Sequence, residues 1–485
     1  MPASPLPAAP SLLWFRDDLR LSDNPALAAL AEARAPIAAL YVLDEDSPGL
    51  RPLGGAARWW LAQSLRALSA ELKRKGVPLI LRRGPANRMV PEVAAALGAA
   101  TVAFNDRAGA PEARVDHAVA ARLLSEDRRV LSFCAHLLHP PGSIEGASGR
   151  MPRTFSSFQR AALKARRLDA PLPVPKHLRG VARPPAGEEL ESFGLEPTHP
   201  DWAAGLRTTW TAGEAAAQAR LAAFIDSGLK GYAAGRDRPD EGHVSRLSPH
   251  LRFGEISPRQ ILSAVRHAAE AGAVTLADAD KFEAELYWRE FSYHLLADQP
   301  DMAQRNIQGA FDGFPWRECP GELKAWHRGL TGYPLVDAGM RQLWQTGWMH
   351  NRVRMVVASF LAKHLLIDWR AGEDWFWDTL VDADPASNPA SWQWVAGSGL
   401  DAAPYFRIFN PVTQGEKFDP DGAYVRAFVP ELAKLPTPFI HKPWTADAHA
   451  LAHAGIRLGH TYPRPLVDHG AARERALRAL ESTRK

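Results

Sequence analysis

Short apolar runs alternate with helical patterns along the first 135 residues, and this alternation limits the possible folds more than any other feature of the chain. The candidate strands are residues 11–15, 37–42, 79–81, 101–105 and 130–133. Between the second and third runs, apolar residues share a helical face up to residue 72, and cations followed by Gly76 mark the helix end. Strands that alternate with helices predict a doubly wound parallel sheet, a Rossmann-like α/β domain over residues 1–135. No G-x-G-x-x-G turn is present, so a dinucleotide site of the Rossmann type is not supported.

The composition is that of a globular protein, since 46% of the 485 residues are hydrophobic and 23% are charged. These values exclude intrinsic disorder, collagen-like repeats and a coiled coil. Two cysteines, Cys134 and Cys319, exclude a disulfide framework and a four-cysteine zinc site. Because no uncharged apolar stretch reaches about 18 residues, we expect no membrane span and a cytoplasmic location. The net charge of +4 permits a polyanionic partner without requiring one.

The rest of the chain divides into two parts. Residues 136–205 lose periodicity and are rich in proline, which favours a long ordered linker, with flexibility as the alternative. From residue 211 the pattern is mostly helical, with loops expected around residues 237–243, 311–321 and 382–391. The predicted domains are therefore an α/β domain (1–135), a linker (136–205) and an all-α domain (206–485).

Tryptophan is concentrated in the helical part, where ten of the 16 tryptophans lie between residues 288 and 394. If one helix continues through Gly347, a set spaced by 4, 3 and 4 shares one face: Trp344, Trp348, Asn351 and Met355. Such a stripe is typical of a buried helix face. Cations at positions 352 and 354 beside it suit an anionic ligand or nucleic-acid phosphates instead.

Three further segments carry ligand-binding chemistry. Residues 382–394 (DADPASNPASWQW) place two acids, an amide and two indoles in a loop-like stretch, which suits the rim of a heterocyclic cofactor or else a solvated acidic loop. No His or Cys stands at metal-ligand spacing nearby, so no metal site is predicted. Residues 242–249 (GHVSRLSP) suit a phosphate before a helix, or a simple helix cap. Glu285, Trp288 and Arg289 share a helix face, either as a ligand-binding set or as a surface ion pair over a half-buried indole.

Six segments resemble the photolyase/cryptochrome family, in the family's order and over nearly the whole chain. They are residues 14–24 (WFRDDLRLSDN), 245–249 (SRLSP), 286–291 (LYWREF), 331–337 (TGYPLVD), 347–352 (GWMHNR) and 401–410 (DAAPYFRIFN). The resemblance implies an N-terminal antenna domain, a long linker and a helical domain that binds FAD. Within the family, the expected match is a class I photolyase, which repairs cyclobutane pyrimidine dimers (CPDs) in DNA.

Motif matching to the family also implies which residues hold FAD. They are Tyr232, Val244, Ser245, Arg246, Leu247, Ser248, Glu285, Arg289, Asn351, Arg354, Asp382, Ala383, Asp384 and Asn388. Arg354 and Asp382 would pair beside the isoalloxazine ring, and Asn388 would face its N5 atom. Position 244 departs from the family's usual Thr, so one hydroxyl contact to the FAD phosphates is lost there.

The implied activity is light-dependent DNA repair, in which excited reduced FAD passes an electron to a flipped-out CPD and the dimer splits into two pyrimidines. The implied partner is UV-damaged DNA, bound by a monomer. The lesion and backbone contacts would be Arg236, Glu285, Trp288, Arg289, Asn351, Arg352, Met355, Trp394 and Arg407. Trp392, Trp369 and Trp316 match the chain that carries electrons to photoexcited oxidised flavin. These three indoles form the implied catalytic set with Glu285 and Asn388. The tryptophans expected to be packing residues are Trp326, Trp344, Trp348, Trp375 and Trp377.

Two related activities are the alternatives. A cryptochrome-type blue-light receptor usually carries Cys or Asp in place of Asn388, and a photolyase for six-four photoproducts uses a histidine pair where this chain has Asn351 and Met355. For the antenna, Glu112 falls where folate-binding members use an acid, but Pro111 replaces the neighbouring Asn. Methenyltetrahydrofolate, a deazaflavin, a second flavin and no antenna are all left open.

Overall fold

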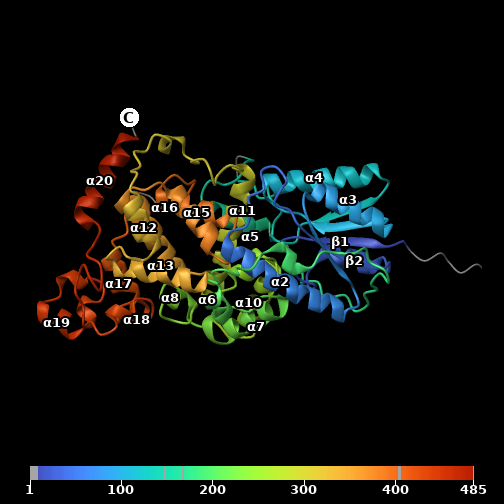
Figure 1. Ribbon diagram of the computed structural model, residues 1–485. Helices are drawn as coiled ribbons and strands as arrows, with labels where there is room; N and C mark the ends of the chain where they lie inside the picture. The colour runs from blue at the N-terminus through green and yellow to red at the C-terminus, as the bar shows by residue number, and fades with distance from the viewer. Residues whose placement is uncertain (1–8, 147–148, 166–168, 402–405, 484–485) are drawn as a thin grey trace, which may run out of the picture.

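The computed structural model describes residues 9–146, 149–165, 169–401 and 406–483. Five parallel strands form a sheet in the order β3-β2-β1-β4-β5, with β1 at its centre. Figure 1 shows β1 beside β2 in this part of the molecule. In register, Ser11 pairs with Ile37 on one side and with Thr101 on the other. The strands are β1 (Ser11–Phe15), β2 (Ile37–Leu43), β3 (Leu79–Arg83), β4 (Thr101–Asn105) and β5 (Arg129–Phe133). The parallel α/β sheet predicted from the sequence is confirmed.

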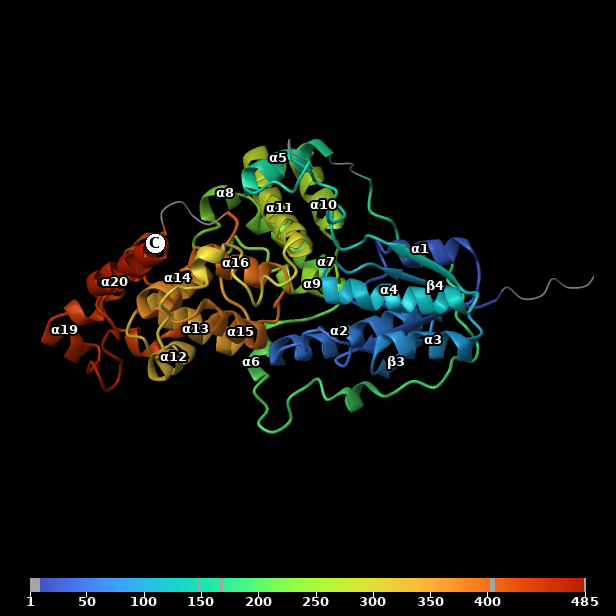
Figure 2. The same cartoon turned by 90° about the horizontal axis from the view of Figure 1, so that it is seen from above.

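Helices cover both faces of this sheet, because successive strand residues point to opposite sides. Leu13 and Phe15 of β1 pack with α1 and α2, whereas Leu12 and Trp14 pack with α3 and α4. The helices are α1 (Pro25–Glu32), α2 (Gly55–Arg74), α3 (Ala86–Leu97) and α4 (Ala110–Ser125). Figure 2 shows this α/β part at one end of the molecule and the later helices at the other.

The stretch interpreted as a linker contains a helix that the sequence did not predict. This helix, α5 (Phe155–Ala165), fully buries Phe158 and Ala162, and its apolar residues do recur at helical spacing, a pattern that the proline-rich surroundings obscured. Elsewhere in the stretch, Gly180 forms a parallel bridge with Ile37 of β2. The domain boundaries at residues 135 and 205 stay predictions.

The second part of the molecule is helical, and its largest buried cluster includes Trp326, Trp369 and Trp392. Its longer helices are α7 (Glu214–Ala223), α10 (Pro258–Glu270), α11 (Leu276–Asp298), α12 (Pro320–His327), α13 (Pro334–Thr346), α14 (Asn351–Ser359), α15 (Trp369–Thr379), α16 (Ser387–Ala396), α17 (Pro411–Phe418) and α20 (His469–Ser482). Its shorter helices are α6 (Ala204–Thr209), α8 (Tyr232–Gly235), α9 (Ser248–Arg252), α18 (Ala423–Phe428) and α19 (Ala448–His453). No helix within the described residues has the length and apolar character needed to cross a membrane.

The helix expected to run through Gly347 is broken there. α13 ends at Thr346, Gly347 takes a left-handed φ of 66°, and α14 starts at Asn351. Glycine adopts this conformation without steric cost, and it commonly ends a helix. The predicted shared face of Trp344, Asn351 and Met355 is therefore wrong. Trp344 is also 61% exposed, so its interpretation as a packing residue is wrong.

The acidic loop is shorter than predicted, because α16 already begins at Ser387. Asp384 explains this start, since one of its carboxylate oxygens accepts hydrogen bonds from the backbone nitrogens of Ala386 and Ser387 at 2.9 and 2.7 Å. Two otherwise unpaired N–H groups at the helix start are satisfied in this way. As a result Asn388, predicted in a loop, projects from the first turn of a helix.

Candidate functional site

A cavity of about 610 Å³ opens in the helical part, lined by residues of α11, α14, α16 and the segment before α9. Of the predicted cofactor set, it is lined by Tyr232, Val244, Ser245, Arg246, Leu247, Ser248, Glu285, Arg289, Asn351, Arg354, Asp382, Asp384 and Asn388. Of the other predicted site residues, it is lined by Arg236, Trp288, Arg352, Met355, Trp392 and Trp394. Its volume lies in the range of about 300–1,000 Å³ that is usual for organic-ligand pockets.

Five predicted residues lie outside the lining of this cavity: Ala383, Trp369, Trp316, Arg407 and Glu112. Trp369 is buried in the core cluster that also contains Trp392, and Trp316 packs against that cluster while half-buried. The three predicted electron carriers therefore range from a cavity-lining indole to one that reaches solvent. Arg407 is exposed, and residues 402–405 of the motif that precedes it lie outside the described residues.

An ion pair on the cavity wall joins α14 to the acidic loop. Arg354 donates from Nη2 to the two carboxylate oxygens of Asp382 at 3.1 and 2.8 Å. The Asp382 side chain is only 3% exposed, whereas that of Arg354 is 24% exposed. Arg354 also donates from Nε to the carbonyl oxygen of Met349 at 2.7 Å, which fixes the direction of its guanidinium. The pairing expected from the sequence is thus present, with both partners lining the cavity.

Asn388 is oriented by Glu373, a buried residue of α15 that the sequence did not single out. The Asn388 amide nitrogen donates to the Glu373 backbone carbonyl at 3.1 Å and to its carboxylate at 2.7 Å. Arg51, which follows β2, donates to the two Glu373 carboxylate oxygens at 2.8 and 2.9 Å. Burial raises the pKa of Glu373, although the Arg51 guanidinium opposes this effect. Because the amide nitrogen is engaged, the side-chain oxygen of Asn388 is the group available to a ligand.

The acidic loop is also tied to the α/β part, through Arg252 of α9. This buried guanidinium donates to the Ala383 carbonyl and to the Asp17 carboxylate, each at 2.8 Å. On the other side of the loop, the Tyr293 hydroxyl donates to Asp384 at 2.7 Å. Burial raises the pKa of Tyr293 well above its ordinary value, so this hydroxyl keeps its proton at neutral pH. Arg252 was missed by sequence reasoning, because both of its partners lie far away in the chain.

The segment before α9 combines hydroxyl groups with an unusual backbone turn. Arg246 has a left-handed φ of 51°, which non-glycine residues seldom adopt. Its guanidinium lies 5.1 Å from the ring centre of Trp348, whose indole nitrogen donates to the Ser248 hydroxyl at 3.3 Å. With Ser245 beside them, these groups offer donors and a positive charge to an anionic ligand. Among the described residues, no cluster of three or more His, Cys, Asp and Glu side chains could bind a metal ion.

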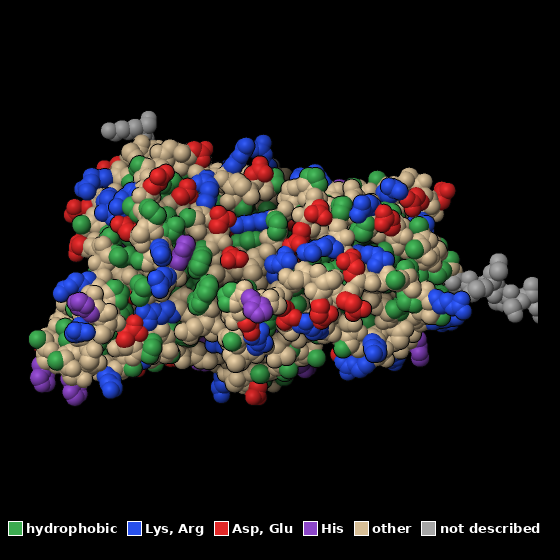
Figure 3. Space-filling view, viewed as in Figure 1, with side chains coloured by type: hydrophobic (Ala, Val, Ile, Leu, Met, Phe, Trp, Pro, Cys, Tyr) green, Lys and Arg blue, Asp and Glu red, His purple; other side chains and the backbone are tan. Residues whose placement is uncertain are grey.

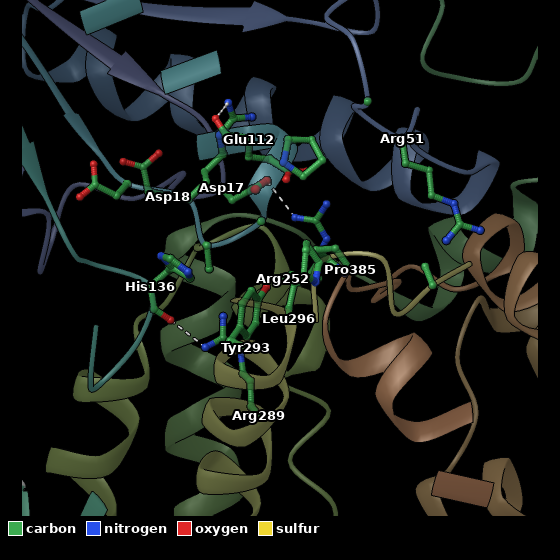
Figure 4. Close-up of a pocket in the computed structure, with 18 of the residues that line it drawn as sticks. Asp17, Asp18, Arg51, Glu112, His136, Arg252, Arg289, Tyr293, Leu296 and Pro385 are labelled. Atoms are coloured by element: carbon green, nitrogen blue, oxygen red, sulfur yellow. Dashed lines mark hydrogen bonds and ion pairs between the residues drawn. The ribbon is translucent and has the colours of Figure 1, made fainter. Parts of the chain in front are cut away.

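Three of the four cations predicted to contact DNA phosphates have hydrogen-bond or ion-pair partners in the protein, and the fourth, Arg407, is exposed. Arg236 forms an ion pair with Glu285, and Arg352 donates to Asp237 at 2.7 Å. Arg289 donates to the backbone carbonyl of His136 at 2.7 Å, beside a second cavity (Figure 4). His136 begins the stretch of residues 136–205 that was interpreted as a linker, called the connector below. Figure 3 shows Lys and Arg side chains interspersed with Asp and Glu over one face of the molecule. Attraction of a polyanion to that face therefore depends on local cations rather than on a uniform positive field.

The second cavity, of about 120 Å³, lies where the sheet meets the helical part (Figure 4). It is lined by residues that follow the carboxyl ends of β1 and β4, at the point where strand order reverses, which is a common ligand position in such sheets. Glu112 lines it, but the ion pair of Asp17 with Arg252 also lies there. Its volume is below the range of about 300–1,000 Å³ for organic-ligand pockets. The antenna role of Glu112 stays a prediction.

Comparisons with known proteins match nearly the full chain. The DNA photolyase family model matches residues 11–176, and the model for the FAD binding domain of DNA photolyase matches residues 282–482. A deoxyribodipyrimidine photo-lyase of Agrobacterium fabrum is 52% identical over 482 residues, which cover 99% of each chain. Cryptochrome-1 of Arabidopsis thaliana is 38% identical over 97% of this chain and 70% of its own length. The crystal structure of a bacterial class III photolyase from Agrobacterium tumefaciens has a TM-score of 0.96 and 50% identity, and the match covers 99% of both chains.

Proposed function

The chain belongs to the photolyase/cryptochrome family and has the activity of a deoxyribodipyrimidine photo-lyase, and from this premise we propose that it repairs CPDs in DNA as a class III enzyme. The observation that carries the proposal is one cavity in which Arg354, Asp382 and the oriented amide of Asn388 lie together with Trp288 and Trp394. The first three offer polar contacts to a heterocyclic ring, and the two indoles offer flat faces to unstacked bases.

The class differs from the expectation of a class I enzyme, which is not supported. The solved structure that covers 99% of this chain at 50% identity is a class III photolyase. Similarity of that extent includes the α/β part, the connector and the cavity-lining helices alike. Class III is therefore the proposal here in place of class I.

FAD is the cofactor of the family domain that this chain contains, and the residues of the large cavity fit it. The hydroxyls of Ser245 and Ser248 and the guanidinium of Arg246 match the needs of a diphosphate. Elsewhere on the cavity lining, Asp382 and Asn388 offer acceptors and Arg354 offers donors to ring nitrogen and carbonyl groups. The volume of about 610 Å³ is large enough for an extended organic ligand to be mostly enclosed.

The chain's own residues supply positioning and a defined hydrogen-bond pattern to this cavity. Bound reduced FAD supplies the electron that light excites and that opens the dimer's cyclobutane ring. Asn388 presents its side-chain oxygen to the cavity. This oxygen accepts a hydrogen bond from a protonated ring nitrogen, whereas it cannot donate one to an unprotonated ring nitrogen. Arg354 balances the charge of Asp382, so this part of the cavity wall does not repel an anionic, electron-rich ligand as an unpaired carboxylate would. Met355 and Trp394 add apolar surface to the cavity lining, which limits water near the reacting bases.

Removing the Glu373 side chain tests this orientation of Asn388. Glu373→Ala removes the charged acceptor and leaves only the 3.1 Å bond to the backbone carbonyl, so the amide is held less firmly. We expect reduced FAD to reoxidise in air about ten-fold faster, given that a hydrogen bond to a charged group contributes about 1.5–3 kcal/mol. Recovery of the oxidised flavin absorbance after photoreduction measures the rate. Glu373→Gln keeps an acceptor for the amide and should stay near the wild-type rate. Unchanged reoxidation in Glu373→Ala would contradict the positioning role.

The proposed lesion is tested with duplex oligonucleotides that carry one thymine CPD, one six-four photoproduct or no damage. The pre-reduced protein is expected to restore intact thymines only in the CPD duplex and only under blue light. Liquid chromatography of the digested DNA measures the products. Repair of the six-four duplex alone would reassign the substrate. Photoreduction of FAD without repair of either lesion would favour a receptor of the cryptochrome type.

A further inference from the structure

The ring of Trp288 in α11 is covered on one side by Phe155, the first residue of α5. The two ring centres are 3.7 Å apart and the planes differ by only 4°. Trp288 lines the large cavity, whereas Phe155 is not among the lining residues. This contact joins the connector to the proposed lesion-binding wall, although 133 residues separate the two positions in the chain.

Other contacts impose this arrangement on the pair. Free aromatic rings prefer an offset or edge-to-face geometry, with centres about 4.5–7 Å apart, over full overlap. Phe291 meets the Trp288 ring at 6.1 Å and 80°, edge to face. The backbone nitrogen of Phe155 donates to the Asp401 carboxylate at 3.0 Å, and Asp401 itself lines the cavity. The indole is therefore held by a face and an edge, with its backing ring anchored independently.

We propose that Phe155 is a positioning residue that sets the plane of Trp288 and thereby determines how strongly a damaged site is distinguished from intact DNA. The inference rests on the proposed function, because it assigns the free side of Trp288 to the flipped-out bases. A base gains from stacking only when the aromatic plane already stands parallel to it, and a ring that can tilt must be ordered on binding. A fixed Trp288 therefore favours the flipped lesion, whereas undamaged duplex, which does not enter the cavity, gains nothing.

Two leucine substitutions on α5 separate positioning from simple packing. Phe155→Leu removes the ring behind Trp288 and keeps an apolar side chain. Phe158→Leu is the control, because Phe158 is more deeply buried and packs on Phe291 and His294, at 5.4 and 5.0 Å, but does not stack on Trp288; Phe155 shares only the Phe291 contact, at 6.3 Å. Phe155→Tyr retains the stack and serves as the conservative rescue. Each holoenzyme is titrated in the dark with a fluorescent duplex carrying one CPD and with the same duplex undamaged. The readout is the Kd for the undamaged duplex divided by the Kd for the damaged duplex.

We expect Phe155→Leu to reduce this ratio about five- to ten-fold, mainly through weaker binding of the damaged duplex, since an aromatic pair contributes at the scale of a two- to ten-fold change. Phe158→Leu should lower the thermal midpoint more and leave the ratio within about two-fold of wild type, and Phe155→Tyr should restore it. A wild-type ratio in Phe155→Leu, or an equal loss in Phe158→Leu, would overturn the inference. Trp288→Ala separates the proposed lesion contact of Trp288 from the positioning role of Phe155. If it too keeps the wild-type ratio, the proposed lesion contact of Trp288 fails, whereas a loss confined to Trp288→Ala refutes only the role of Phe155.

Discussion

Replacing Trp392 with Phe is expected to slow photoreduction of bound oxidised FAD by more than about 100-fold, a barrier increase of about 2.7 kcal/mol. Trp392 lines the large cavity, whereas Trp369 does not line it and Trp316 is the half-buried member of the set. A phenyl ring in place of the cavity-lining indole fills most of the space but gives up an electron much less readily. The rate of flavin bleaching under blue light, with an external reductant present, measures the effect.

The same variant should still repair a CPD once its FAD has been reduced chemically. The three tryptophans only transfer electrons to oxidised FAD and take no part in opening the dimer. Trp444→Phe is the control, since Trp444 is a half-buried indole of the helical part, packed 5.3 Å from Tyr333 and outside the cavity lining. It should photoreduce at the wild-type rate. Photoreduction of Trp392→Phe at the wild-type rate would remove this indole from the pathway. Equal loss of photoreduction and of repair by the pre-reduced enzyme would show a structural defect instead.

Replacing Arg354 with Ala is expected to weaken FAD binding by at least about 100-fold, or about 2.7 kcal/mol. The substitution leaves the Asp382 carboxylate, 3% exposed, without its guanidinium partner. Breaking a fully buried pair in this way costs about 3–5 kcal/mol, and the smaller value expected here reflects the 24% exposure of Arg354. The FAD content of the purified protein and the Kd for added FAD measure the loss.

Two variants identify the cause of this loss. Arg354→Lys keeps the charge but not the two-point contact with Asp382 and the Met349 carbonyl, so its affinity should fall between wild type and Arg354→Ala. Asp382→Asn removes the negative charge while keeping the shape of the side chain, and its pairing with Arg354→Ala in one double variant should cost less than the sum of the two. Wild-type FAD affinity in Arg354→Ala would contradict the placement of the ion pair beside the cofactor.

Much of the α/β part could be predicted from the sequence, because a strand buried on both faces is a continuous apolar run. Leu12 and Leu13 are both buried in β1, one on each face, so the run is visible without knowing its neighbours. The cavity residues were also recognisable, since family motifs retain both residue type and order. Most of the predicted site residues line one cavity, although five do not: Ala383, Trp316, Trp369, Arg407 and Glu112.

Two predictions from local sequence patterns were wrong, one about a helix through Gly347 and one about a stretch without helical periodicity, which contains α5. The spacing of Trp344 and Asn351 suggested one helix, but the left-handed Gly347 ends it and leaves Trp344 exposed. The sequence of α5 places Phe155, Phe158 and Ala162 at helical spacing, but this short helix lies in a proline-rich stretch that was interpreted as a linker.

By itself, the sequence determined the parallel sheet, the family and the chemical types that gather at the cavity, since these depend on residue identity and on local order along the chain. Only the tertiary structure decided how those groups are aimed. Glu373 turns the amide of Asn388, Arg252 ties the acidic loop to Asp17, and Phe155 fixes the plane of Trp288. Each of these contacts joins residues on different elements. A hydrogen bond or a ring stack is directional, so its effect exists only when packing has already brought both partners to the right distance and angle.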